Sequence, residues 1–144
     1  MTVQPGESPG FLLWHTTLRW QRGIAAALAP LGLTHVQFVL LACTYWMNGQ
    51  GEHPNQQALA RQAGTDVKMT SQVLRTLEQK NLIAREVDPD DTRAKRLRVT
   101  DAGAELAPRA MAAVEEADAR FFRPVPLADT LALLGRLARP DGTP

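Results

Sequence analysis

The chain has 144 residues, a formal net charge of +1 and a single cysteine, Cys43. That length suits one domain with a helical extension, and a single cysteine excludes an internal disulfide and is typical of a reducing compartment. No apolar run is long enough to cross a membrane, and residues 1–10 lack the basic and apolar segments of a secretory signal, so we expect a cytoplasmic protein with no membrane partner.

The N-terminal part of the chain predicts a flexible arm followed by a long helix. Residues 1–10 are mostly polar and contain two prolines and two glycines. Residues 11–28 have helical periodicity with two apolar stripes, one that includes Trp20 and another that includes Trp14. Two stripes predict burial on two sides, one against the rest of the chain and one against a partner.

The next segments predict a helix-turn-helix. Thr34 can cap a helix over residues 35–47, which is apolar nearly all round and should be central. Residues 48–54 are a turn-rich connection that could hold a very short strand. Asn55 can then cap a short helix that ends at Gly64, and a tight turn leads into a second helix.

The second helix of this motif has one buried face and one polar face. Asp66 can cap its start by accepting hydrogen bonds from free amides of the first turn. Helical spacing predicts a buried face made by Thr70, Val73, Leu74 and Leu77. The opposite face, whose polar members can reach base edges, carries Lys68, Met69, Ser71, Gln72 and Arg75.

A basic hairpin follows this helix. Asn81 tolerates the left-handed conformation that ends a helix, and residues 84–87 and 97–99 are short strand candidates. Residues 93–98 contain four cations and no acid, so positive charge is concentrated at the hairpin, where it includes Lys95 and Arg96. A helix followed by such a hairpin can enter a major groove while the hairpin meets the adjacent backbone or minor groove.

Two further helices complete the chain. Thr100 can cap a long helix over residues 101–122, with a face of small or apolar residues at Ala102, Leu106, Ala113 and Ala117. Two prolines end it, and residues 127–137 form a last helix with one leucine-rich side at Leu131, Leu134 and Leu137. The predicted fold class is therefore mainly α with a small β-hairpin wing.

Three groups of residues make a recognisable pattern. The first is Gly32-Leu33-Thr34, followed by Gln37-Phe38 and Leu41. The second is Leu59-Ala60 and Gly64, then Leu74, Leu77-Glu78 and Leu82-Ile83. The third is Asp91-Thr92-Arg93, then Leu97, Val99-Thr100 and Gly103. Over residues 11–137 the pattern resembles the MarR family of winged helix-turn-helix regulators, with Asn81 where glycine is usual and Val99 where leucine is usual.

The resemblance implies a homodimeric regulator, in most cases a repressor, that reads palindromic DNA. It implies a DNA-binding domain at residues 34–100 and a helical dimerisation region at residues 11–33 and 101–139. It also implies that Arg93 enters the minor groove and that Asp91 orients Arg93. Two linked reading heads agree with the physical expectation that one short helix in a groove binds weakly.

The aromatic residues of the first two helices have two interpretations. They can be core and dimer packing, or they can line a pocket for a small aromatic or amphipathic anion that releases the DNA. The residues of the second interpretation are Trp14, His15, Arg19, Trp20, Tyr45 and Trp46. Nothing in the sequence identifies the ligand.

Enzymatic, metal and redox functions are not expected. The sequence has no nucleophile–base pair, Gly-rich phosphate loop or cofactor motif, and its three histidines and Cys43 lack the spacing of metal ligands. Cys43 lies in a nearly all-apolar helix, where a core thiol is the usual state. The remaining alternative is a winged-helix module for protein association without specific DNA binding, and the cations of the hairpin tip argue against it because association surfaces are depleted in lysine.

Overall fold

The computed structural model describes residues 2–140, which form a mainly helical chain with one two-stranded antiparallel hairpin, as predicted. The elements in chain order are η1 Pro5–Glu7, α1 Pro9–Leu28, η2 Ala29–Leu31, α2 His35–Gly49, α3 Gln56–Ala63, α4 Val67–Gln79, β1 Ile83–Val87, β2 Lys95–Val99, α5 Asp101–Phe121 and α6 Leu127–Ala138.

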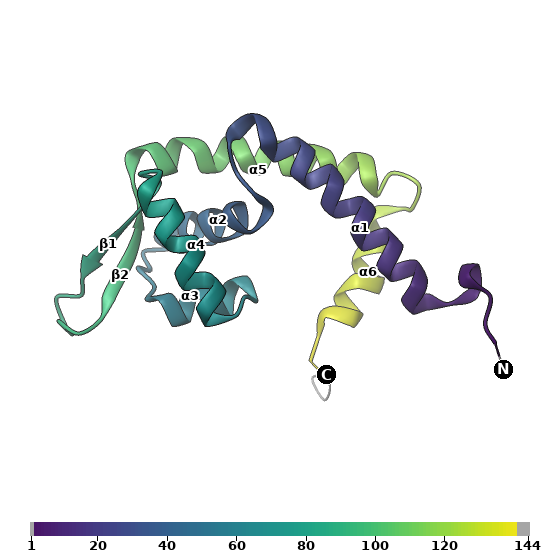
Figure 1. The fold of residues 1–144 in the computed structure, drawn as a ribbon, viewed down its shortest axis with the longest axis horizontal. Coiled ribbons are helices and arrows are strands. Elements are labelled where there is room, and N and C mark those ends of the chain that lie inside the picture. The colour runs from purple at the N-terminus through teal and green to yellow at the C-terminus, as the bar shows by residue number, and fades with distance from the viewer. Residues whose placement is uncertain (1, 141–144) are drawn as a thin grey trace.

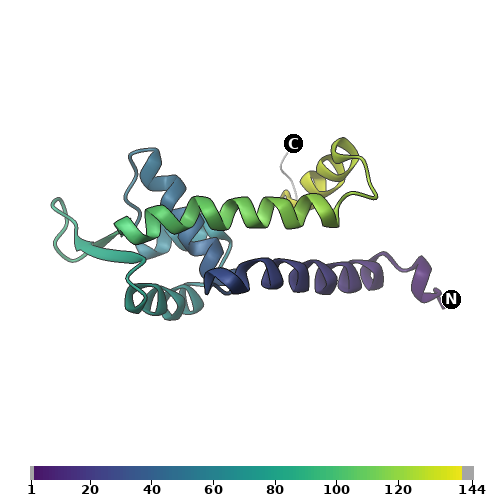
Figure 2. The ribbon, with the colours of Figure 1, turned by 90° about the horizontal axis from the view of Figure 1, so that it is seen from above.

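The molecule has a compact head and a helical extension (Figure 1). Helices α2, α3 and α4 pack together in the head, and the hairpin projects from it. Helices α1 and α5 run side by side in opposite directions away from the head (Figure 2). The Trp20 indole Nε1 donates to Asp118 Oδ1 at 2.8 Å and joins these two helices. Helix α6 lies at the far end of the extension.

One aliphatic core holds the head to the extension. Helix α2 is central, as expected, because it buries side chains along most of its length. The largest fully buried aliphatic residues come from α1, α2, α3, α4 and both strands, and they are Ile24, Leu28, Leu40, Leu41, Leu59, Leu74, Leu77, Ile83 and Leu97. Ala107 and Ala110 of α5 are also fully buried. Burial of each such side chain contributes about 1.5–3 kcal/mol, so this cluster fixes how the head sits on α1 and α5.

The predicted helix caps are present. Thr34 makes a capping box with Gln37, and Asn55, Asp66 and Thr100 each accept a hydrogen bond from an amide of the following first turn. Helix α1 begins at Pro9 rather than residue 11, because the Ser8 side chain caps it and proline is favourable in a first turn.

Glycine is required where α5 begins. A Cβ at Gly103 would lie 2.0 Å from the Leu82 carbonyl oxygen, so only glycine allows this close approach. The approach directs Gly103 into the head, and the buried stripe of α5 is Gly103, Ala107, Ala110 and Ala117. Of the predicted small-residue face, Ala117 is buried, Leu106 and Ala113 are half-buried, and Ala102 is exposed.

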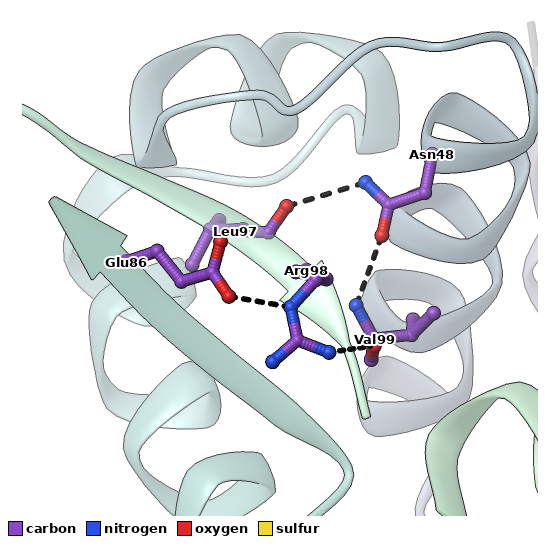
Figure 3. Close-up of polar contacts among 5 residues, drawn as sticks. All are labelled: Asn48, Glu86, Leu97, Arg98 and Val99. Atoms are coloured by element: carbon purple, nitrogen blue, oxygen red, sulfur yellow. Dashed lines mark hydrogen bonds and ion pairs between the residues drawn. The ribbon is translucent and has the colours of Figure 1, made fainter. Parts of the chain in front are cut away.

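The free edge of β2 is covered by side-chain and loop groups instead of a third strand. The Asn48 amide donates from Nδ2 to the Leu97 carbonyl at 3.2 Å and accepts at Oδ1 from the Val99 amide at 2.9 Å (Figure 3). The Leu97 amide donates to the Pro54 carbonyl at 2.8 Å. The short strand considered for residues 48–54 is therefore replaced by these bonds, which also fix the hairpin to the end of α2.

Within residues 2–140, no single helix is long and apolar enough to cross a membrane. Only the pair Pro9–Leu31 and His35–Gly49, taken together, reaches that length and apolarity, and the two segments are bent by 72° to each other.

Candidate nucleic-acid interface

The exposed face of α4 carries the side chains predicted for it. Thr70, Leu74 and Leu77 are buried and Val73 is half-buried, so the helix packs on the head through the predicted face. On the opposite side Ser71 is half-buried, and the exposed residues are Lys68, Met69, Gln72 and Arg75. Helix α4 therefore presents a surface of cations, an amide and a thioether to an external partner.

The acids of this helix are occupied by internal bonds. Asp66 accepts from the Lys68 amide at 2.8 Å and from the Met69 amide at 3.3 Å. Glu78 forms an ion pair with Arg85 of β1. Among residues 2–140, no carboxylate lies within ion-pair distance of Lys68 or Arg75, the two cations on the exposed face of α4. The charge left for a partner on this face is positive.

A polar network that sequence reasoning missed holds α4 against the wing. Arg85 bonds Glu78 from Nε, and its Nη1 donates to Gln56 Oε1 at 3.3 Å. The Gln56 Nε2 donates in turn to the Val67 carbonyl at 3.3 Å, at the start of α4. The network therefore connects β1 to both ends of α4. Side chains two residues apart on a strand lie on the same face, so Arg85 shares the face of buried Ile83. This alternation is the only feature of the sequence that indicated an inward position for Arg85.

The wing tip is folded by its aspartates. Asp91 Oδ1 accepts from the Arg93 backbone amide at 3.0 Å, and Asp88 Oδ1 accepts from the Asp90 amide at 2.9 Å. Asp91 thus orients Arg93 through its backbone. The side chains of Arg93 and Lys95 are exposed. These carboxylates shape the turn that presents the cations, as short polar side chains do in tight turns.

The base of the wing has a second charged cluster. Glu86 Oε1 accepts from Arg98 Nε at 2.6 Å (Figure 3), and this hydrogen bond, helped by the charges of Arg98, Arg96 and His53, lowers the pKa of Glu86 below its usual value. Glu86 is therefore ionised and partly neutralises Arg98. Arg96 is half-buried, and among the described residues its Nε is buried without a hydrogen-bond partner.

The predicted aromatic ligand residues are spread over two helices. Trp20 is half-buried between Asp118, which accepts its hydrogen bond, and His35, whose ring is edge-on with centroids 5.0 Å apart. Tyr45 is half-buried against the core. The exposed members are Trp14, His15, Arg19 and Trp46, and His15 packs edge-on against Phe11.

A hollow of about 460 Å³ lies beside this group but is lined by other residues. Its wall comes from α1, α2 and the end of α3, at Gln21, Thr34, His35, Val36, Val39, Ala63 and Thr65. None of the six predicted ligand residues lines it, and Trp20 is linked to it through His35. Burial lowers the pKa of His35, although the charge of Asp118 partly opposes this, so the imidazole is neutral near pH 7.

Neither Cys43 nor a cluster of metal-ligating side chains forms a reactive site in the part of the chain that the structure describes. Burial raises the pKa of the half-buried Cys43, which keeps it a thiol rather than a reactive thiolate. Within residues 2–140 no three His, Cys, Asp or Glu side chains are grouped in a way that could hold a metal ion.

Comparison with known proteins gives a consistent match. The sequence model of the MarR family matches residues 33–95. An uncharacterized HTH-type transcriptional regulator of Bacillus subtilis, YdcH, is 46% identical over 118 residues, which cover 82% of this chain and 80% of YdcH. The HTH-type transcriptional repressor Rv2887 of Mycobacterium tuberculosis is 36% identical over 113 residues, which cover 78% of each chain.

Solved structures agree with the sequence matches. CouR of Rhodococcus jostii RHA1 bound to p-coumaroyl-CoA has a TM-score of 0.82 at 27% identity, covering 94% of this chain and 93% of CouR. The repressor CouR bound to a 23-mer DNA duplex has a TM-score of 0.81 at 27% identity, covering 96% and 97%. These matches confirm the predicted fold and the prediction of a regulator rather than an enzyme.

Proposed function

Because this chain belongs to the MarR family of transcriptional regulators, we propose that it is a repressor that binds palindromic DNA as a homodimer and is released by a small aromatic or amphipathic anion. Residues 34–100 are the DNA-binding domain in this proposal, and residues 11–33 and 101–139 are the dimerisation region. The relative CouR has been solved bound to a DNA duplex, which supports the DNA-binding part of the proposal.

The observation that carries the proposal is the charge on the exposed face of α4 and on the wing. Asp66 is used as a helix cap and Glu78 is paired with Arg85, whereas Lys68, Arg75 and Arg93 are exposed. Neutralisation of phosphates by such free cations releases counterions and supplies much of the affinity for DNA. The polar side chains between the cations are those that form hydrogen bonds with base edges.

Exposed apolar side chains support the dimer. Leu127, Leu131 and Leu137 of α6 are 68%, 62% and 66% exposed, and Trp14 of α1 is 63% exposed. A monomer would leave these large side chains in water, and both helices that carry them belong to the extension (Figure 1). A second copy of the chain that covers α1 and α6 would bury them and would hold two reading heads at a fixed distance.

The hollow beside His35 supports a ligand site. Its wall is apolar at Val36, Val39 and Ala63 and polar at Gln21 and Thr65, which suits an aromatic ring with one polar group. It lies where α1 meets the head, so a bound ligand can change the angle between the head and the extension. Rv2887 has been solved in complex with salicylic acid, and this structure has a TM-score of 0.66 at 32% identity, covering 90% of this chain.

The proposal is tested by fluorescence anisotropy with a labelled duplex from the region upstream of the protein's own gene. We expect binding that an excess of random duplex does not displace and that weakens steeply as salt concentration rises. Equal affinity for the upstream duplex and for random duplexes at moderate salt would contradict specific DNA recognition.

A further inference from the structure

We infer that the first turn of α4 reads thymine through its methyl group, with Met69 and Val67 as the side chains that contact it. The inference rests on the proposed DNA-binding function and specifies what the DNA site must contain. It assigns a base-contacting role to Val67, which was not among the residues predicted for the exposed face of this helix.

The first turn of α4 exposes two large apolar side chains on a helix whose other exposed residues are polar. Val67 is 49% exposed and Met69 is 42% exposed. Residues two apart on a helix lie about 200° apart around its axis, so the two side chains border the polar face on opposite sides. Lys68 and Gln72 lie between them. An apolar residue on each edge of a polar face can contact a different wall of a groove.

The backbone of both residues is anchored by side chains outside the exposed face. The Val67 carbonyl accepts from Gln56 Nε2 at 3.3 Å, and the Met69 amide donates to Asp66 Oδ2 at 3.3 Å. The first turn of α4 is therefore fixed by a bond at each of the two residues. In helix-turn-helix proteins the N-terminal residues of the second helix are those that contact base edges.

Charge complementarity identifies the partner as DNA rather than a protein. The cations Lys68 and Arg75 share the exposed face with Met69, and the neighbouring acids Asp66 and Glu78 are occupied. A protein-binding helix face is usually apolar at its centre and depleted in lysine, whereas here the centre is charged and the edges are apolar. The apolar group that DNA bases present in the major groove is the C5-methyl of thymine.

The test uses deoxyuridine, which keeps the hydrogen-bonding groups of thymine and lacks its methyl. A duplex is first selected from a random library with the full chain, and each thymine is then replaced singly by deoxyuridine. We expect one or two positions in each half-site where the replacement weakens binding about fourfold, the change that corresponds to about 0.8 kcal/mol for one buried carbon. The remaining thymines serve as internal controls.

Variants assign each sensitive position to a side chain. At the thymine that Met69 contacts, Met69→Ala should bind the thymine and deoxyuridine duplexes equally well, and Val67→Ala should do the same at the thymine that Val67 contacts. Met69→Leu keeps a large apolar side chain and should retain the difference in affinity. Gln79→Ala, an exposed change at the other end of α4, should leave every difference intact. Thermal melting confirms that all variants are folded.

The outcomes separate the inference from the proposed function. A selected duplex in which no deoxyuridine replacement has an effect would overturn the inference and leave DNA binding established. Sensitivity that persists in both alanine variants would also overturn it, because other residues would then read the methyl groups. A selection that yields no preferred duplex would overturn the proposed function itself.

Discussion

The Lys80 ammonium donates to the Gly32 carbonyl oxygen at 2.6 Å. Lys80 is the C-terminal cap of α4, and Gly32 lies in the left-handed turn between α1 and α2. The same ammonium donates to Gln37 Oε1 at 2.9 Å, within the capping box of α2. One side chain therefore ties the end of α4 to the point where the extension joins the head.

Replacement of Lys80 by methionine should weaken this joint. The change removes two hydrogen bonds and the favourable charge at the helix C-terminus but keeps most of the apolar stem. Because the group is exposed, we expect the free energy of unfolding to fall by only about 0.5–1 kcal/mol. Chemical denaturation measures it, with Lys68→Met as the matched control. Equal stability of the two variants would show that the Lys80 bonds contribute nothing.

Arg93→Ala should weaken DNA binding without affecting folding. The Arg93 side chain is exposed, and its backbone is positioned by Asp91, so its loss leaves the turn intact. We expect a loss of about 1–3 kcal/mol per half-site and a slope of affinity against salt that is smaller by about one. Arg109→Ala, an exposed arginine on α5, is the control. Unchanged affinity for the duplex at moderate salt would remove Arg93 from the interface.

Leu131→Asp should dissociate the proposed dimer. Leu131 is 62% exposed on α6, and a charge there would be buried twice in a symmetric interface. Loss of two buried leucines alone corresponds to about 3 kcal/mol or more, so dimer dissociation should be at least about 100-fold easier. Sedimentation equilibrium measures it. Val87→Asp, at a 57% exposed site on the wing, should remain dimeric, and an unchanged Leu131→Asp dimer would place the interface elsewhere.

A ligand bound in the hollow beside His35 should lower the affinity of the protein for DNA. An aromatic acid such as salicylate should bind more weakly when the duplex is present, by a coupling of about 1–3 kcal/mol that acts equally in both directions. A variant with Trp14→Phe and Trp46→Phe leaves Trp20, which touches His35, as the fluorescent reporter. Ligand affinity that is independent of DNA would show that the hollow is not the switch.

The same site should respond to pH in a defined direction. Burial lowers the pKa of His35, so the imidazole is neutral near pH 7, and a bound anion would favour its protonated form. Binding of the acid should therefore take up a proton and become tighter as pH falls towards the histidine range. His35→Gln should remove this dependence, and a slope that survives in His35→Gln would assign it to another group.

Local features of the fold followed from the sequence, and long-range ones did not. The caps by Asp66 and Thr100 and the left-handed turn at Asn81 were predicted correctly because each depends on a few neighbouring residues. The close approach of Gly103 to Leu82 could not be predicted, because it depends on how the start of α5 packs against the segment between α4 and β1. For this reason the predicted small-residue face shares only Ala117 with the buried residues of α5, which also include Gly103, Ala107 and Ala110.

The candidate site shows the same division. The exposed face of α4 could be predicted from helical periodicity alone, since burial on one side implies exposure on the other. The bond of Arg85 to Gln56 joins residues that are 29 positions apart, and the bond of Arg85 to Glu78 joins a strand to the preceding helix across a turn, so no spacing rule indicates either. The hollow was also missed, because small and aliphatic residues such as Val36 and Ala63 line it rather than the more conspicuous aromatics.

In the proposed function, two copies of this chain read two half-sites at once. The most direct measurement compares a selected palindromic duplex with one that has about five base pairs inserted at its centre, by anisotropy and by sedimentation of the complex. The half-sites are expected about 10–10.5 base pairs apart or a multiple of that, and the insertion turns one of them to the opposite side of the helix. We predict two chains per palindromic duplex and a loss of affinity of at least about 100-fold on insertion. One chain per duplex, with the same affinity for both DNAs, would contradict it.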